Sequence, residues 1–158
     1  MISDAVNEIL NEQINKEFHS GYLYLSMSTY LKHLGLNGFA SWLKIQAREE
    51  VEHGLKILDY LVDCDSFVTL KQIKMPEFEF TNILEIFNII LDHEKCITRA
   101  IMSVAKMSED ECDRTTLNFI DWFDEHTLGW GYFISLGIIA VLTIFMFIVL
   151  IVNTRRKK

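Results

Sequence analysis

The chain has 158 residues, of which 50% are hydrophobic and only one is proline. This length suffices for one domain with a sizeable core. The last four residues are Arg155, Arg156, Lys157 and Lys158, and no acidic residue follows Glu125, so the rest of the chain has 11 positive against 22 negative side chains, a net charge of −11. An acidic body repels phosphate backbones, which argues against nucleic acid as a partner and favours metal ions.

The cysteines indicate a reducing compartment. Cys64, Cys96 and Cys112 are odd in number, form no C-x-x-C pair and follow no secretory signal peptide. Such a pattern is typical of a protein without a disulfide framework. We therefore expect a cytoplasmic location.

The first half of the chain predicts two antiparallel helices. A helix over residues 4–33 is predicted from a Ser3 or Asp4 cap followed by a stripe at steps of three and four, formed by Val6, Ile9, Leu10, Gln13, Glu17, Gly21, Tyr24 and Met27. After a short break at residues 35–38, a second helix over 39–62 repeats the period with Leu43, Ala47, Leu55, Leu58 and Leu61. The short break predicts that the two helices pack side by side in opposite directions.

A long connection and two further helices follow. The periodicity fades over residues 63–79, where the single proline, Pro76, lies. A third helix is predicted from 81–83 to about residue 106, with one side formed by Ile83, Phe87, Ile90, Leu91, Glu94, Ile97 and Ile101. Ser108 predicts the cap of a fourth helix that ends near Glu125, with acids in its first turn. The fold class is therefore all-α, a four-helix bundle with one long crossover.

The end of the chain has a different character. Residues 130–152 contain no charged side chain. Trp130 and Tyr132 stand at the start of this run, and a basic end follows it. As a helix the run is roughly 34 Å long, enough for a bilayer core of about 30 Å. We predict a bundle domain over 1–126 and a transmembrane helix with a basic tail over 127–158. The alternative is that this helix completes the core of the bundle.

Acidic residues in the middle of three predicted helices indicate a metal site. Glu50 and His53 are three positions apart, so on a helix they can hold one ion. Glu17 and Glu94 lie on otherwise apolar stripes, where a buried carboxylate costs several kcal/mol without a counter-charge. Carboxylates with an imidazole suit iron, manganese or zinc better than calcium. The alternative for each residue is a solvated helix face, but the set as a whole favours a metal.

Four stretches carry a resemblance to a known family: "NEQINKEFHSGYLYLSM", "REEVEHGLKILDYL", "DHEKCIT" and "TLNFIDWF". With them, residues 5–125 resemble a bacterial-type non-haem ferritin. The resemblance implies a di-iron centre in which Glu17, Glu50 and His53 hold one iron and Glu50 bridges to a second iron on Glu94. Tyr24 matches the tyrosine beside that centre, with a core aromatic as the alternative, and Glu49 matches an acid of an accessory third iron site.

The resemblance also implies a function. Such proteins store and detoxify iron: they oxidise ferrous iron with dioxygen or hydrogen peroxide, a ferroxidase reaction, and deposit ferric mineral inside a hollow homo-oligomer. Hard carboxylate oxygens favour ferric over ferrous iron, and two neighbouring irons deliver two electrons together. No haem is expected.

The sequence departs from the family after Trp122, where it reads "DWFDEHTLGWGYF". Aligned without a gap, Thr127 takes the place of the family's glutamine; with one deletion, His126 takes it. Later glutamates are missing in both alignments, so we expect a weakened second iron site and a lost accessory site. His126 either compensates as a ligand or faces solvent.

Two alternative functions follow from this departure. The first alternative to an iron-oxidising ferritin is a membrane-anchored iron-binding module without efficient oxidation, held by residues 130–152. The second is a decayed ferritin whose reading frame changed after Trp122 or Glu125.

Overall fold

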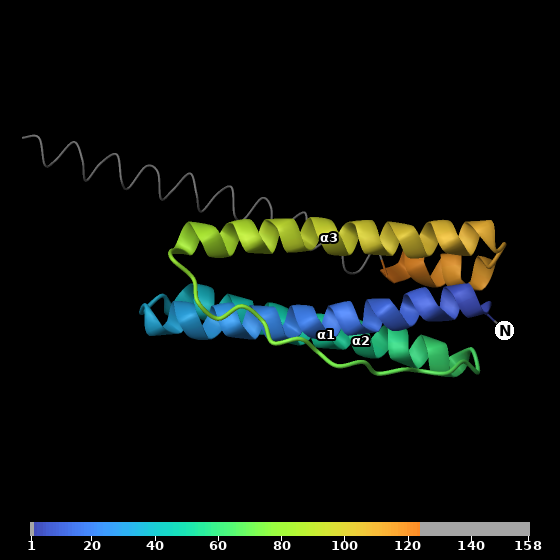
Figure 1. Ribbon diagram of the computed structural model, residues 1–158, viewed down its shortest axis with the longest axis horizontal. Helices are drawn as coiled ribbons and strands as arrows, with labels where there is room; N and C mark the ends of the chain where they lie inside the picture. The colour runs from blue at the N-terminus through green and yellow to red at the C-terminus, as the bar shows by residue number, and fades with distance from the viewer. Residues whose placement is uncertain (1, 124–158) are drawn as a thin grey trace, which may run out of the picture. The chain divides into compact units, whose positions relative to one another are not determined.

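The computed structural model describes residues 2–123. The helices are α1 (Asp4–His33), α2 (Asn37–Asp63) and α3 (Ile83–Asp110), followed by a fourth helical segment over residues 114–123. Within the compact unit Met1–Trp122, α2 runs back along α1, and the connection over residues 64–82 returns along the bundle to the start of α3 (Figure 1). This arrangement confirms the all-α four-helix bundle with one long crossover.

The predicted span of the first helix is confirmed at both ends. The side-chain oxygen of Ser3, the N-cap, accepts a hydrogen bond from the Val6 amide at 3.2 Å. Asp4 stands in the first turn and Lys32 and His33 in the last, where each charge complements the helix dipole. The chain then turns at Gly35, whose φ of +77° suits a glycine.

The start of α2 and the buried faces of α2 and α3 differ in detail from the prediction. Helix α2 begins at Asn37, so Gly38 is helical instead of part of the break. Leu43, Ala47 and Leu61 are buried as predicted, but Leu55 is 45% exposed, and on α3 Leu91 is 38% exposed. Gly54 and Ile57 share the buried face of α2, and Leu55 is displaced from that face because successive helix positions are rotated by about 100°.

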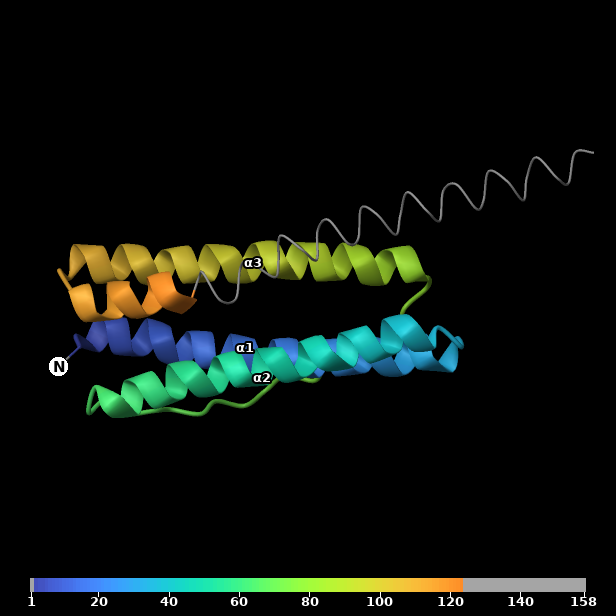
Figure 2. The same cartoon turned by 180° about the vertical axis from the view of Figure 1, so that it is seen from behind.

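The crossover is hydrogen-bonded to two side chains of α1, one near each end of the crossover. The Asn11 side chain donates to the Phe67 carbonyl at 3.1 Å and accepts from the Thr69 amide at 2.6 Å. Further along, the Ser26 hydroxyl donates to the Glu77 carbonyl at 2.5 Å. These contacts satisfy backbone groups of a segment that has no secondary structure of its own. Figure 2 shows the crossover from behind, where α1 and α2 lie side by side.

The predicted cap of the fourth helix is wrong. Ser108 is buried in the last turn of α3, and its hydroxyl donates to the Val104 carbonyl at 2.9 Å. The chain turns at Cys112, with a φ of 56°, and the Asp113 carboxylate then accepts from the Thr116 amide at 3.0 Å. The cap is therefore Asp113, because a serine hydroxyl can bond back into its own helix and so does not force an end.

No helix within residues 2–123 is long and apolar enough to cross a membrane. The predicted spanning segment over 130–152 and the predicted boundary between 126 and 127 lie outside the described residues.

Candidate metal centre

Two glycines bring α1 and α2 close together. A Cβ atom on Gly21 of α1 would lie 3.0 Å from the Ala47 carbonyl oxygen of α2. A Cβ atom on Gly54 of α2 would lie 2.7 Å from the Phe18 ring of α1. Both distances are shorter than ordinary carbon contacts, so only glycine allows this approach. The short separation lets acidic side chains from the two helices reach one another.

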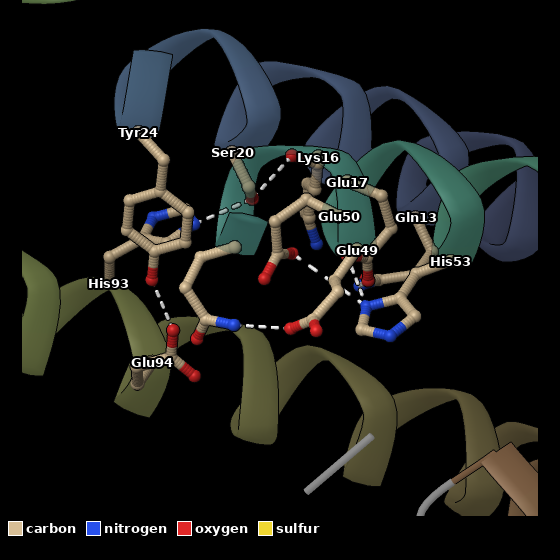
Figure 3. Close-up of polar contacts among 11 residues, drawn as sticks. Gln13, Lys16, Glu17, Ser20, Tyr24, Glu49, Glu50, His53, His93 and Glu94 are labelled. Carbon is tan, nitrogen blue, oxygen red and sulfur yellow. Dashed lines mark hydrogen bonds and ion pairs between the residues drawn. The ribbon is translucent and has the colours of Figure 1, made fainter. Parts of the chain in front are cut away.

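Three potential ligands meet between these helices. Glu17 comes from α1, and Glu50 and His53 come from adjacent turns of α2; one ligand atom from each lies within 4.8 Å of the others. His53 Nδ1 is 3.9 Å from Glu17 Oε2 and 3.9 Å from Glu50 Oε2 (Figure 3). Two carboxylates and an imidazole form a nitrogen and oxygen ligand set that suits iron, manganese or zinc.

Glu17 is the most deeply buried of the three, with an exposed fraction of 0%. Its Oε1 accepts a hydrogen bond from Gln13 Nε2 at 2.5 Å. Within the part of the chain that the structure describes, its Oε2 is buried and has no hydrogen-bond partner. A buried carboxylate oxygen without a donor is costly, and a bound cation is one way to offset that cost. The residues present therefore fit a metal ion.

Burial changes the proton affinity of all three groups. It raises the pKa of Glu50 to about 8. It also raises the pKa of Glu17 well above its usual range, with the neighbouring Glu50 charge as the next cause. The pKa of His53 is lowered by burial, so its imidazole is neutral and offers a lone pair. A cation that binds here must displace protons from the carboxyl groups.

Glu94 and Tyr24 form a separate pair beside this group. The Tyr24 hydroxyl, on α1, donates to Glu94 Oε1 on α3 (Figure 3). Burial and the nearby Glu94 charge raise the pKa of Tyr24 well above its usual range, so the phenol keeps its proton. Burial also raises the pKa of Glu94. The charge of Glu94 is felt at Glu50, where it raises the carboxyl pKa, so the two acids share one environment.

The family model described as a ferritin-like domain matches residues 7–127 of the chain. The chain belongs to the ferritin family.

Curated relatives of this ferritin bear related names. It is 38% identical over 123 residues to the bacterial non-heme ferritin of Campylobacter jejuni, an alignment that covers 78% of this chain and 74% of the relative. It is 34% identical over 125 residues to a probable bacterial non-heme ferritin-like protein of Haemophilus influenzae, covering 79% and 76% of the two chains.

Solved structures agree with this assignment. A ferritin from Archaeoglobus fulgidus engineered into a closed form is 33% identical, with a TM-score of 0.85, and the match covers 91% of this chain and 87% of that one. A humanized archaeal ferritin is 36% identical, with a TM-score of 0.79, over 82% and 78% of the two chains.

Among the described site residues, the predicted ligand Glu49 is not part of the group of three. Glu49 accepts a hydrogen bond from Gln46, its neighbour on α2, and is not a member of the group within 4.8 Å. His126 lies outside the described residues, as does Thr127. The structure thus brings Glu17, Glu50 and His53 together, with Glu94 and Tyr24 beside them. The carboxylate of Glu49 instead accepts a hydrogen bond from a glutamine amide.

Two polar contacts beside the centre were missed by sequence reasoning. Gln13 lay on the predicted stripe four positions before Glu17, which was a usable signal, since such pairs face each other on a helix. The second is the contact of 2.6 Å between Ser20 Oγ on α1 and His93 Nε2 on α3. No spacing rule links positions on separate helices, so this pair left no signal in the sequence.

Proposed function

We propose that this ferritin stores and detoxifies iron: it oxidises ferrous iron at Glu17, Glu50 and His53 and deposits the product as ferric mineral. The observation that supports this most directly is the buried Oε2 of Glu17, which has no hydrogen-bond partner in the described chain and lies 3.9 Å from His53 Nδ1. The names of the curated relatives, bacterial non-heme ferritins, support iron as the cation.

The protein's part in the reaction is to bind and orient the ferrous substrate. In this proposal Glu17 and His53 hold one ferrous ion, and Glu50 reaches both that ion and a second one on Glu94. Tyr24 donates to only one oxygen of Glu94, so the other oxygen stays available as a ligand. The neutral His53 imidazole adds no positive charge that would repel the incoming cation.

The electron balance needs two ferrous ions for each two-electron oxidant. Two Fe²⁺ ions lose one electron each, and dioxygen takes up two electrons and two protons to give hydrogen peroxide. With hydrogen peroxide as the oxidant, two electrons and two protons give two water molecules. Carboxylate oxygens favour the ferric product, which then hydrolyses to mineral. The mineral is enclosed by a homo-oligomer of this chain.

Ferrous oxidation in air tests the proposal. The purified full-length chain, mixed with Fe²⁺ in aerated buffer, is expected to oxidise it much faster than buffer does, and Glu50→Ala is expected to remove that excess rate. Glu52→Ala, an exposed acid on the same helix, is the control and is expected to keep it. Tight Fe²⁺ binding with oxidation no faster than in buffer would contradict the ferroxidase role.

A membrane-anchored iron-binding module is the second candidate. The uncharged run over residues 130–152 favours it, as does the absence of the later glutamates from the sequence. Sizing chromatography with iron analysis separates the two candidates: a large iron-loaded particle without detergent supports storage, whereas a chain that stays in the membrane fraction until detergent is added supports anchoring. Sequencing the gene across the codons for Trp122 and Glu125 tests the decayed reading frame.

A further inference from the structure

Gln13 and Glu17 form a hydrogen-bonded pair inside the bundle. They are four positions apart on α1, which places them one above the other on the same helix face. Gln13 is 1% exposed and Glu17 is 0% exposed, so water reaches neither side chain. The 2.5 Å hydrogen bond from Gln13 Nε2 to Glu17 Oε1 is thus a contact in a dry environment, where it is stronger than at the surface.

This bond distinguishes the two oxygens of the Glu17 carboxylate. Oε1 is occupied by the amide, whereas Oε2 is the atom that lies 3.9 Å from His53 Nδ1 (Figure 3). A carboxylate with one oxygen fixed cannot rotate freely, so the second oxygen keeps its direction. The amide also lowers the pKa of Glu17, against the larger effect of burial that raises it.

The other end of the Gln13 amide has a cost for the fold. Gln13 Oε1 is buried and, among residues 2–123, has no hydrogen-bond donor. A buried carbonyl without a donor destabilises a protein, and an apolar side chain of similar shape avoids that penalty. Glutamine is therefore a poor choice for packing alone at this position. The contact that distinguishes it from an apolar residue is the bond to Glu17.

We propose that Gln13 is a positioning residue of the metal centre: its amide N–H fixes Glu17 Oε1 so that Oε2 is presented to the cation. The inference rests on the proposed function, since it requires that a cation binds at Glu17, Glu50 and His53. Groups that orient a metal ligand through a hydrogen bond typically change metal affinity by roughly 10- to 100-fold when removed.

The test is Gln13→Met, which keeps the unbranched shape of the side chain and removes both amide groups. Anaerobic titration calorimetry with Fe²⁺ is expected to show affinity weakened by roughly 10- to 100-fold. The melting temperature of the metal-free variant is expected to stay the same or rise, because the unpaired carbonyl is gone. A purely structural role predicts the reverse: a lower melting temperature and unchanged affinity for Fe²⁺.

Gln13→Asn provides a second variant that keeps a polar amide at the site. Its side chain is one methylene shorter, so its N–H cannot reach Glu17, and the same loss of Fe²⁺ affinity is expected. Affinity equal to that of the unaltered protein in both folded variants would overturn the proposal. If Gln13→Met does not fold, Gln13→Asn decides by the same criterion.

Gln46→Met is the matched control. Gln46 is a buried glutamine on α2 whose amide also donates to a glutamate, Glu49, but that glutamate is outside the group of three. Its loss is expected to leave Fe²⁺ affinity unchanged.

Glu50→Ala distinguishes a failure of the proposed function from a failure of the role of Gln13. Binding that survives Glu50→Ala contradicts the proposed function itself, whereas binding lost in Glu50→Ala but kept in both Gln13 variants contradicts only the role of Gln13.

Discussion

Burial and neighbouring negative charge both favour the protonated form of the acids in the candidate metal centre. Burial raises the carboxyl pKa of both Glu17 and Glu50. The nearby Glu50 charge adds to the rise at Glu17, and the charges of Glu94 and Glu49 add to the rise at Glu50. Without a cation the cheaper state is the protonated one, because it leaves no buried negative charge. The buried carboxylates are therefore stabilised by binding positive charge, either as protons or as a metal ion.

The pH dependence of stability follows from this preference. Between the ordinary glutamate pKa of 4.5 and the raised value of about 8 at Glu50, the folded state binds a proton that the unfolded state has released. The free energy of unfolding of the metal-free protein should therefore fall as the pH rises through that window, and the stabilising proton is lost above it. Urea unfolding at about pH 7 and about pH 8, above the ordinary histidine pKa, measures the slope.

Glu50→Gln removes this titration and should make the slope shallower, leaving the part that the other buried acids, Glu17 and Glu94, contribute. Glu52→Gln changes an exposed acid on the same helix and should leave the slope as it is. Below the ordinary histidine pKa of 6.5, the lowered pKa values of His53 and His93 contribute a slope of the opposite sign. A free energy of unfolding that rises with pH above that value in the unaltered protein would show that these carboxyls are already ionised without metal.

At the scale of the helices, the close approach of α1 and α2 sets the distance between the acids. Gly21 faces the Ala47 carbonyl, and Gly54 faces the Phe18 ring and the Cβ atom of Glu17. Glycine in a helix interior costs about 1 kcal/mol relative to alanine. That cost is offset here because a wider separation would move Glu17 away from Glu50 and His53.

Gly54→Ala should test this role of the glycines. The added Cβ would lie 2.7 Å from the Phe18 ring, so the ring or the helices must shift, and we expect a loss of about 1–3 kcal/mol in the free energy of unfolding. Affinity for Fe²⁺ should fall too, measured by anaerobic calorimetry. Gly38→Ala is the matched control, since Gly38 lies in the same helix with nothing within 4 Å of an added Cβ. That control should be neutral or stabilising.

The ends of the helices were predictable only where one residue dominates the choice. Ser3 caps α1 as the sequence predicts, because its side chain accepts the Val6 amide and has no preceding turn to bond to. Ser108 has such a turn and bonds back to it, and Asp113 is the cap instead.

Glu50 and His53 were predictable as neighbours from their spacing alone. Their distance to Glu17 depends on the contacts of Gly21 and Gly54, which no local rule supplies.

Substitution of Asp113 checks the cap. Asp113→Ala removes the acceptor for the Thr116 amide and should lower the free energy of unfolding by roughly 0.5–2 kcal/mol. Ser108→Ala removes only a hydroxyl that bonds within its own helix, so it should be close to neutral. Chemical denaturation of both variants measures the difference, and an equal loss in the two would contradict Asp113 as the cap.

At the scale of the whole molecule, the candidate centre joins the packing of the bundle to the binding of a cation. Its acids come from α1, α2 and α3, so they meet only when these helices have packed. A cation that binds the folded chain and not the unfolded one must therefore stabilise the bundle as a whole. The negative charge of the chain before its basic end adds a general attraction for that cation.

The melting temperature should accordingly rise with a divalent transition metal. A free metal concentration about 100 times the dissociation constant adds about 2.7 kcal/mol to the free energy of unfolding. For a chain of this size each kcal/mol corresponds to roughly 2–4 °C.

Zn²⁺ is a suitable probe because it takes the same nitrogen and oxygen ligands and does not undergo oxidation. The shift should be larger near pH 8 than near pH 6, because fewer carboxyl protons then compete with the metal. Glu50→Ala should abolish the shift, and a chelator should reverse it in the unaltered protein. An equal shift in Glu50→Ala would mean that Zn²⁺ binds elsewhere on the acidic surface, and the bundle would then be stable without any cation between its helices.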